Sequence, residues 1–193
     1  MAQITTEPVA ADRWDDAVHA LTGGGDGKSC WCQWWLLSNT EFSALPADEK
    51  QRMLRDEVAA TAPPPALVAY VDGAAAGWVR VGPRTDQPRL LRTEIVRRGT
   101  NESLDADDVW AISCLVVRRE HRGQGLMDVL VTAAVAHARA CGARVVEAYP
   151  VETEDRRVSS NELYHGVVRV FEAAGFTAVA RPKPRRPVMA LAL

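Results

Sequence analysis

The chain of 193 residues has no long apolar run, little net charge and no paired cysteine motif. Its best apolar segment, residues 126–140, is interrupted by His137 and Arg139 and does not reach the length of a membrane span. The formal net charge of −2 gives no electrostatic reason to expect binding to nucleic acid or to an anionic membrane. We therefore expect one soluble domain, residues 1–193, with neither of these partners.

A secretion signal and a metal motif are also missing. The N-terminal stretch MAQITTEPVAADRWDD lacks a charged segment followed by an apolar one. Cys30-x-Cys32 has no second pair of ligands at zinc spacing, and Cys114 falls inside an expected strand. These observations predict a cytoplasmic protein with reduced thiols and no metal site.

Periodicity and turn residues predict a mixed α/β fold, an α+β mixed sheet of about seven strands flanked by about four helices. The expected strands are residues 4–6, 66–71, 77–81, 109–117, 144–149, 177–180 and 188–193. The expected helices are residues 13–21, 47–60, 125–140 and 167–174. Residues 83–108 read as a polar, irregular insert, in which 90–96 is a candidate edge strand. The connection between strands 109–117 and 144–149 is a βαβ crossover, so these two strands should be parallel.

The most informative segment is Leu115–Met127, LVVRREHRGQGLM, where an apolar strand, a glycine-bearing basic turn and a helix follow one another. Glycines 123 and 125 remove the Cβ atoms that would keep a phosphate from the backbone, and the helix start adds unpaired N–H groups. Arg122 can add charge-assisted hydrogen bonds. The pattern is suited to holding a pyrophosphate.

The order Arg122-x-x-Gly125-x-Met127 resembles the acyl-CoA-binding signature of the GNAT N-acyltransferase superfamily, with Met127 in place of a small residue. Phe171–Phe176, FEAAGF, resembles a second signature of the same superfamily. The resemblance covers nearly the whole chain and implies a splayed pair of parallel strands that holds acetyl-CoA. The cofactor-binding residues that it implies are Leu115, Val116, Val117, Arg122, Gly123, Gln124, Gly125, Leu126 and Met127. Among them, the Leu115 N–H is our candidate for polarising the thioester carbonyl.

The acid–base group is not identified by the resemblance. The usual tyrosine position holds Phe171, and Ser113 stands where a strand glutamate is often found. The catalytic candidates are therefore Glu147, Tyr149 and His165, with Tyr164 beside them. Each is better explained as a surface or pocket-wall residue.

The segment Cys30–Trp35, CWCQWW, is the other unusual feature. Trp31, Trp34 and Trp35 form either an aromatic wall of the acceptor-substrate pocket or a hydrophobic anchor for the first helices. The insert 83–108 and the loop 150–165 should shape the same pocket. The preceding glycine run is not a P-loop, because Thr22 stands where that motif needs glycine.

The residues and the resemblance together predict an acetyl-CoA-dependent N-acetyltransferase. The acceptor would be a primary amine of a small molecule or protein, attacking directly in a ternary complex. The alternative is an acyl-CoA-binding regulatory module without turnover, and transfer to oxygen or of another acyl chain stays open. A homodimer through the apolar last strand, 188–193, is a further expectation.

Overall fold

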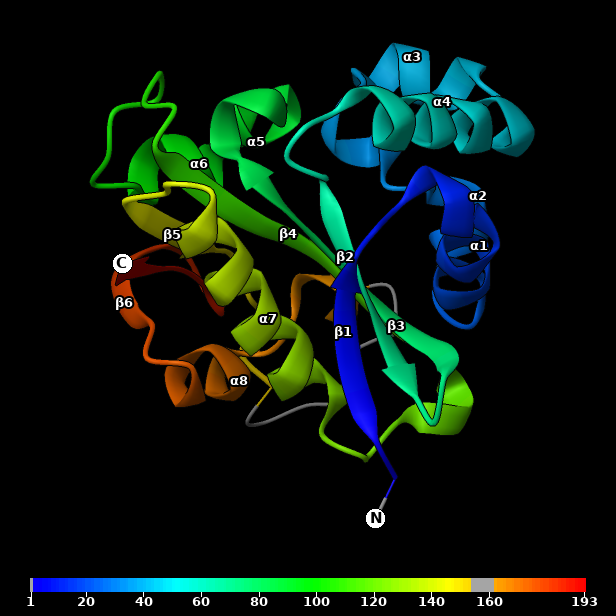
Figure 1. Cartoon of the computed structure of the whole chain (residues 1–193). Coiled ribbons are helices and arrows are strands. Elements are labelled where there is room, and N and C mark those ends of the chain that lie inside the picture. Colours follow the sequence, from blue (N-terminus) through cyan, green and yellow to red (C-terminus); the bar gives the residue numbers. More distant parts are fainter. Residues whose placement is uncertain (1, 154–161) are drawn as a thin grey trace.

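The computed structural model describes residues 2–153 and 162–193 of the chain (Figure 1). The strands are β1 (Ile4–Pro8), β2 (Ala66–Val71), β3 (Ala74–Pro83), β4 (Val109–Val117), β5 (Val145–Ala148), β6 (Thr177–Lys183) and β7 (Arg186–Ala192). The α-helices are α1 (Trp14–Thr22), α2 (Gly27–Cys30), α3 (Asn39–Ala44), α4 (Ala47–Ala60), α5 (Pro88–Arg92), α6 (Glu94–Gly99), α7 (Leu126–Ala140) and α8 (Val168–Ala173). Short 3-10 turns include η2 (Gln33–Trp35) and η5 (Leu163–His165).

The seven strands form one mixed sheet in the order β1-β2-β3-β4-β5-β7-β6. Only β4 and β5 run parallel, joined by α7 as the crossover predicts, and every other neighbouring pair is antiparallel. β7 pairs with β5 on one side and with β6 on the other. The last strand is therefore internal to the sheet, and both of its edges are occupied within this chain.

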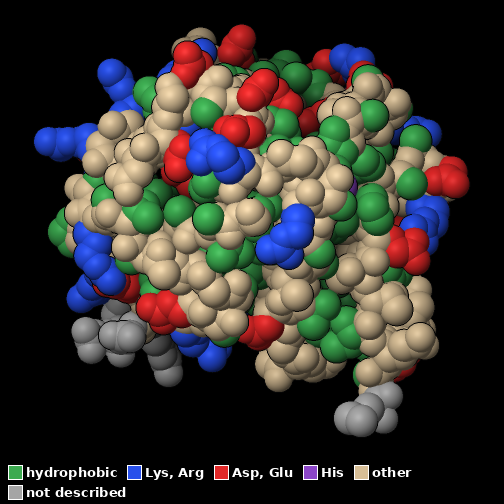
Figure 2. Space-filling view, turned by 60° about the vertical axis from the view of Figure 1, so that its left-hand side comes forward, with side chains coloured by type: hydrophobic (Ala, Val, Ile, Leu, Met, Phe, Trp, Pro, Cys, Tyr) green, Lys and Arg blue, Asp and Glu red, His purple; other side chains and the backbone are tan. Residues whose placement is uncertain are grey.

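Helices cover both faces of the sheet (Figure 1). On one face, α7 and α8 pack over a core that includes Leu130, Phe171 and Trp110. On the other, α1, α4 and the insert helices close a second core around Trp78 and Leu90. Positively and negatively charged side chains are interspersed on the face drawn in Figure 2.

A bulge in β4 changes which residues face each core. Arg80 of β3 pairs with Cys114, but the next residue, Val81, pairs with Ile112, so Ser113 is the extra residue. Ile112 and Leu115 consequently lie in the α7 core, while Cys114 lies in the opposite one. A strand with regular alternation would have placed Leu115 and Ile112 on opposite faces.

The expected edge strand at 90–96 is wrong: this part of the insert forms α5 and α6. Pro88 occupies the start of α5, and the Thr93 side chain caps α6 by accepting a hydrogen bond from the Val96 N–H. Leu90 and Val96 point into the core on successive helices, which a period-2 interpretation of the same apolar residues misses.

Two short helices before α4 were also not predicted. α2 follows the glycine run, and α3 begins at a capping box formed by Ser38 and Glu41. Ser-x-x-Glu is a sequence signature of a helix start, so α3 was readable from the chain. Among the described residues, no helix is long and apolar enough to cross a membrane.

Candidate functional site

The parallel strands β4 and β5 separate after four paired residues. Their register ends at Ile112 and Ala148, whereas β4 continues alone on this side to Val117. After Tyr149 and Pro150, the chain bridges instead to the segment before α8, through Val151 and Val167. A gap therefore opens beside residues 113–117 of β4.

The backbone of β4 presents two residues to this gap. Arg118 donates its N–H to the carbonyl of Ala76, next to β3. Because backbone groups alternate along an antiparallel pair, Val116 also faces β3, and Leu115 and Val117 face the open side. Their N–H and C=O groups are available to a molecule lying in the gap.

The turn after β4 ends the gap with a cluster of N–H groups. Gly123 and Gly125 have φ values of 76° and 78°, a left-handed conformation that favours glycine. Within residues 2–153 and 162–193, the N–H groups of residues 123–127 have no hydrogen-bond acceptor. The start of α7 adds its positive dipole end to these donors.

A cavity of about 920 Å³ joins the gap to this turn. Of the predicted cofactor-binding residues, eight line the cavity and Gln124 does not. The eight are Leu115, Val116, Val117, Arg122, Gly123, Gly125, Leu126 and Met127. The Met127 side chain also packs against the core beneath α7, so it is directed partly away from the turn.

The glycine run before α2 forms the opposite wall of this cavity, which sequence reasoning missed. Gly24, Gly25 and Gly27 line the cavity, and the carbonyl of Gly23 accepts a hydrogen bond from the Arg119 N–H. A Cβ atom on Gly24 would come within 2.9 Å of the Arg122 guanidinium. The run therefore does more than end α1: it lets the chain pass close to the arginine of the turn.

The tryptophan segment divides between two roles. Trp31 is buried, lies outside the cavity and stacks on Trp14 with ring centroids 6.4 Å apart, so it anchors the helices. Trp34 and Trp35 line the cavity. Trp31 and Cys32 have φ values of 48° and 56°, a strained left-handed bend that turns the chain between α2 and η2.

Three thiols line the same cavity: Cys30, Cys32 and Cys114. A hydrogen bond from Cys114 lowers the pKa of the Cys32 thiol, and the buried guanidinium of Arg80 acts in the same direction. Burial raises the pKa of Cys30 to about 11. Of the three, Cys32 has the greatest thiolate character.

A second cavity of about 540 Å³ adjoins the first, and both are lined by Trp34, Trp35 and Tyr164. The insert helices α5 and α6 and the start of β7 complete its wall. Its other lining residues are Leu37, Ser38, Asn39, Arg89, Leu90, Arg92, Thr93, Ile95, Tyr149, His165 and Arg186.

Tyr164 and His165 of η5 lie where the two cavities meet. Their rings are 4.0 Å apart, and His165 also contacts Trp35 with ring centroids 5.7 Å apart. Burial, reinforced by the charge of Arg186, lowers the pKa of His165 to about 3, so this imidazole is neutral at pH 7. Burial raises the pKa of Tyr164 to about 12, which keeps its hydroxyl protonated.

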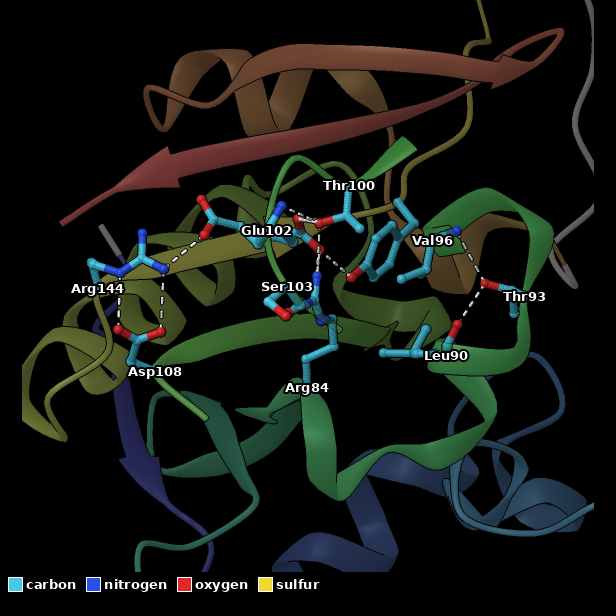
Figure 3. Close-up of polar contacts among 11 residues, drawn as sticks. Arg84, Leu90, Thr93, Val96, Thr100, Glu102, Ser103, Asp108 and Arg144 are labelled. Carbon is cyan, nitrogen blue, oxygen red and sulfur yellow. Dashed lines mark hydrogen bonds and ion pairs between the residues drawn. The ribbon is translucent and has the colours of Figure 1, made fainter. Parts of the chain in front are cut away.

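Glu147 does not line either cavity. Its carboxylate is fully buried and accepts hydrogen bonds from Arg84 at 2.7 Å, Thr100 at 2.5 Å and the Tyr149 hydroxyl at 2.8 Å. Figure 3 shows the Arg84 and Thr100 side chains converging in this network. The Tyr149 hydroxyl donates a hydrogen bond to Glu147, and burial together with this carboxylate raises the pKa of Tyr149 well above its usual value.

This network ties the insert to the sheet. Arg84 and Thr100 lie near the two ends of the insert, and Glu147 lies on β5 next to the gap. Close by, Arg144 pairs with Asp108 and Glu102 at the surface (Figure 3). The geometry gives Glu147 and Arg84 a positioning role, since the two side chains are buried and form an ion pair with each other. No three His, Cys, Asp or Glu side chains among the described residues are grouped so as to hold a metal ion.

Comparison with known proteins agrees with the fold. The family described as "Acetyltransferase (GNAT) family" matches residues 31–167. This chain belongs to the GNAT acetyltransferase family. No curated protein matches it.

Several solved structures share this fold at low sequence identity. The PaiA N-acetyltransferase of Thermoplasma acidophilum, in complex with coenzyme A, has a TM-score of 0.56 and 11% identity, over 99% of both chains. YncA of Salmonella typhimurium, a putative acetyltransferase with its cofactor acetyl-CoA, has a TM-score of 0.54 and 17% identity, over 98% of this chain and 94% of that one. The GNAT domain of S. lividans PAT has a TM-score of 0.55 and 17% identity, over 100% and 90%.

Proposed function

We propose that this GNAT protein is an acetyl-CoA-dependent N-acetyltransferase acting on a primary amine. The observation that carries the proposal is the unpaired edge of β4, which runs directly into the glycine turn inside one cavity of about 920 Å³. Solved relatives of this fold hold coenzyme A or acetyl-CoA. When bound, acetyl-CoA supplies an activated acyl group as a thioester.

The chain offers separate groups to the two ends of such a ligand. N–H groups of residues 123–127 and the Arg122 guanidinium suit a pyrophosphate. The Leu115 and Val117 backbone groups suit the amides of the pantetheine arm, and the Leu115 N–H is placed to polarise a carbonyl. Apart from that of the Arg122 guanidinium, these contacts use main-chain atoms, so they do not depend on the departure at Met127.

Tyr164 is our candidate for moving a proton. His165 is neutral and lines the second cavity, but with a pKa of about 3 it is too weak a base to deprotonate an ammonium group, so we assign it the role of a hydrogen-bond acceptor for the neutral amine. Tyr164 is protonated and lines both cavities, so it can donate a proton to a departing thiolate. Phe171, at the usual tyrosine position, is buried against Phe176 and lines neither cavity.

Calorimetry with acetyl-CoA, and with ATP as a control, tests the cofactor assignment. We expect micromolar binding of acetyl-CoA and none of ATP. Release of free thiol in the presence of an amine library then tests turnover. Binding without any turnover would support the alternative, a regulatory acyl-CoA-binding module, and no binding would refute the proposal.

The Tyr164→Phe variant tests the proton donor once an acceptor is known. We expect kcat to fall by roughly 10²- to 10⁴-fold with the affinity for acetyl-CoA unchanged, because only the hydroxyl is removed. Phe171→Tyr added to Tyr164→Phe is the control. This second substitution should not restore kcat, since position 171 lies in the core. A Tyr164→Phe enzyme with normal kcat would eliminate Tyr164 as the donor.

A further inference from the structure

The second cavity carries positive charge and no lining carboxylate among the described residues. Three guanidinium groups reach its wall from two elements: Arg89 and Arg92 from α5, and Arg186 from the start of β7. The nearest acidic influences are Glu41 on Arg92 and Glu162 on Arg186, and neither of these carboxylates lines the cavity. This concentration contrasts with the mixed charges of the face in Figure 2.

Arg89 is largely committed to the protein. Its guanidinium stacks on Trp34 with its carbon 3.6 Å from the ring centroid, and it donates hydrogen bonds to the Leu37 carbonyl and the Asn39 side chain. Its role is to hold Trp34 in place between the two cavities. It adds charge to the second cavity but few free donors.

Arg186 and Arg92 have donors to spare. Arg186 gives one hydrogen bond, to the Tyr149 carbonyl at 3.2 Å, and its Nε atom is buried with no acceptor in the described part of the chain. Arg92 is exposed and forms no ion pair with any described carboxylate, so its donors are open to a ligand but are not buried. A buried N–H of a charged group without an acceptor is costly, so a ligand that supplied an acceptor would be favoured.

The positive charge of these arginines shifts the pKa values of neighbouring groups. Burial and then the charge of Arg92 lower the pKa of Arg89, and Arg186 helps to lower the pKa of His165. An anion bound by Arg92 and Arg186 would offset this positive charge. Trp34, Trp35 and Tyr164 line both cavities, whereas the glycine turn lines only the first.

We propose that the second cavity is an anion subsite for the acceptor, and that the acceptor is a small amine that also carries a carboxylate. Arg186 and Arg92 bind the carboxylate, which leaves the amine beside His165 and Tyr164 at the junction of the cavities. Aromatic walls from Trp34, Trp35 and Tyr149 suit an apolar side chain of an amino acid. A volume of about 540 Å³ suits a molecule of this size.

This inference rests on the proposed function, and the test separates the two. Acetyl-CoA binding is measured first by calorimetry for wild type, Arg92→Gln, Arg186→Gln and Arg97→Gln, and we expect equal affinities. Arg97 is the matched control because it is an exposed arginine on the same insert that does not line the cavity. Failure of the wild type to bind acetyl-CoA overturns the proposed function and this inference with it.

Matched acceptors then test the subsite itself. L-phenylalanine is compared with phenethylamine and L-tryptophan with tryptamine, so that each pair differs only in the carboxylate. We expect kcat/KM to be higher for the amino acid by roughly 10- to 100-fold. Arg92→Gln and Arg186→Gln should each remove most of this preference, whereas Arg97→Gln should keep it.

A binding measurement decides the matter if neither member of a pair is acetylated. The protein saturated with coenzyme A is titrated with N-acetyl-L-phenylalanine and with N-acetylphenethylamine. Tighter binding of the carboxylate, lost in Arg186→Gln but not in Arg97→Gln, supports the subsite. Equal binding of the two probes, or no binding of either, overturns it even when acetyl-CoA binds normally.

Discussion

The two cavities are built in different ways from the same sheet. The first uses backbone N–H groups of one continuous segment, β4 and the turn into α7. Its hydrogen-bond donors are therefore main-chain groups, which every residue except proline supplies. The second uses side chains from the insert, η5 and β7, which are distant in sequence. The first cavity therefore constrains the glycines of its turn more than its other side chains, while the second depends on the side chains of several elements.

Breaking the ion pair behind the second cavity should have the largest effect. Arg84→Met leaves the carboxylate of Glu147 buried and without its cation, so we expect a loss of about 3–5 kcal/mol of stability in urea unfolding. The double variant Arg84→Met with Glu147→Leu removes both charges and should recover most of the loss. A double variant as unstable as the single one would contradict the charge argument.

Glutamate at Gly125 should disable the first cavity alone. Gly125 has positive φ and faces the space assigned to a pyrophosphate, so the added carboxylate would repel it. We expect acetyl-CoA affinity in calorimetry to fall by roughly 100-fold or more, about 2.7 kcal/mol. Gly73→Glu, at a hairpin glycine with φ of 83° and open surroundings, carries the same backbone cost and should bind normally. Normal binding by Gly125→Glu would disprove the cofactor assignment.

Alanine at Gly27 probes the start of α2, in the wall of the first cavity. Its Cβ atom would overlap the carbonyl oxygen of Leu21, which is backbone and cannot easily move. We expect a loss of about 1–3 kcal/mol in urea unfolding, because the start of α2 must shift. Gly82→Ala, where a Cβ meets open space, is the matched control and should change stability little. Equal stability of the two variants would show that the loop adjusts freely.

The smallest effect concerns the charge state of His165. In the unfolded chain this histidine takes up a proton near pH 6.5, whereas in the folded protein its pKa is lowered to about 3. The unfolded state therefore binds more protons between these values, and stability falls as the pH drops below 6.5. Between pH 7.5 and 5.5, wild type should lose about 1.4 kcal/mol more than His165→Gln, measured by urea unfolding. An identical pH dependence would mean that the folded imidazole is solvated and titrates normally.

Much of the fold was predictable because its signals are local. Apolar runs, capping residues and glycine turns gave β2, β4 and α4 with their observed bounds, and the βαβ crossover gave the parallel pair. The secondary structure of the insert was harder to predict, since apolar residues at positions 90 and 96 are compatible with a short strand as well as with two short helices. Pro88 and the cap at Thr93 decide between them, and their effect depends on the core that α5 and α6 cover.

The sequence by itself determined the sheet, its crossover and the glycine turn, because apolar runs and turn residues are local signals and glycine at 123 and 125 permits the positive φ of this turn. Only the tertiary structure decided which side chains are free to act. It buried Glu147 against Arg84, brought the glycine run to Arg122, and gathered Arg92 and Arg186 beside His165. Contacts between residues so far apart in the chain depend on packing, and no spacing in the sequence records them.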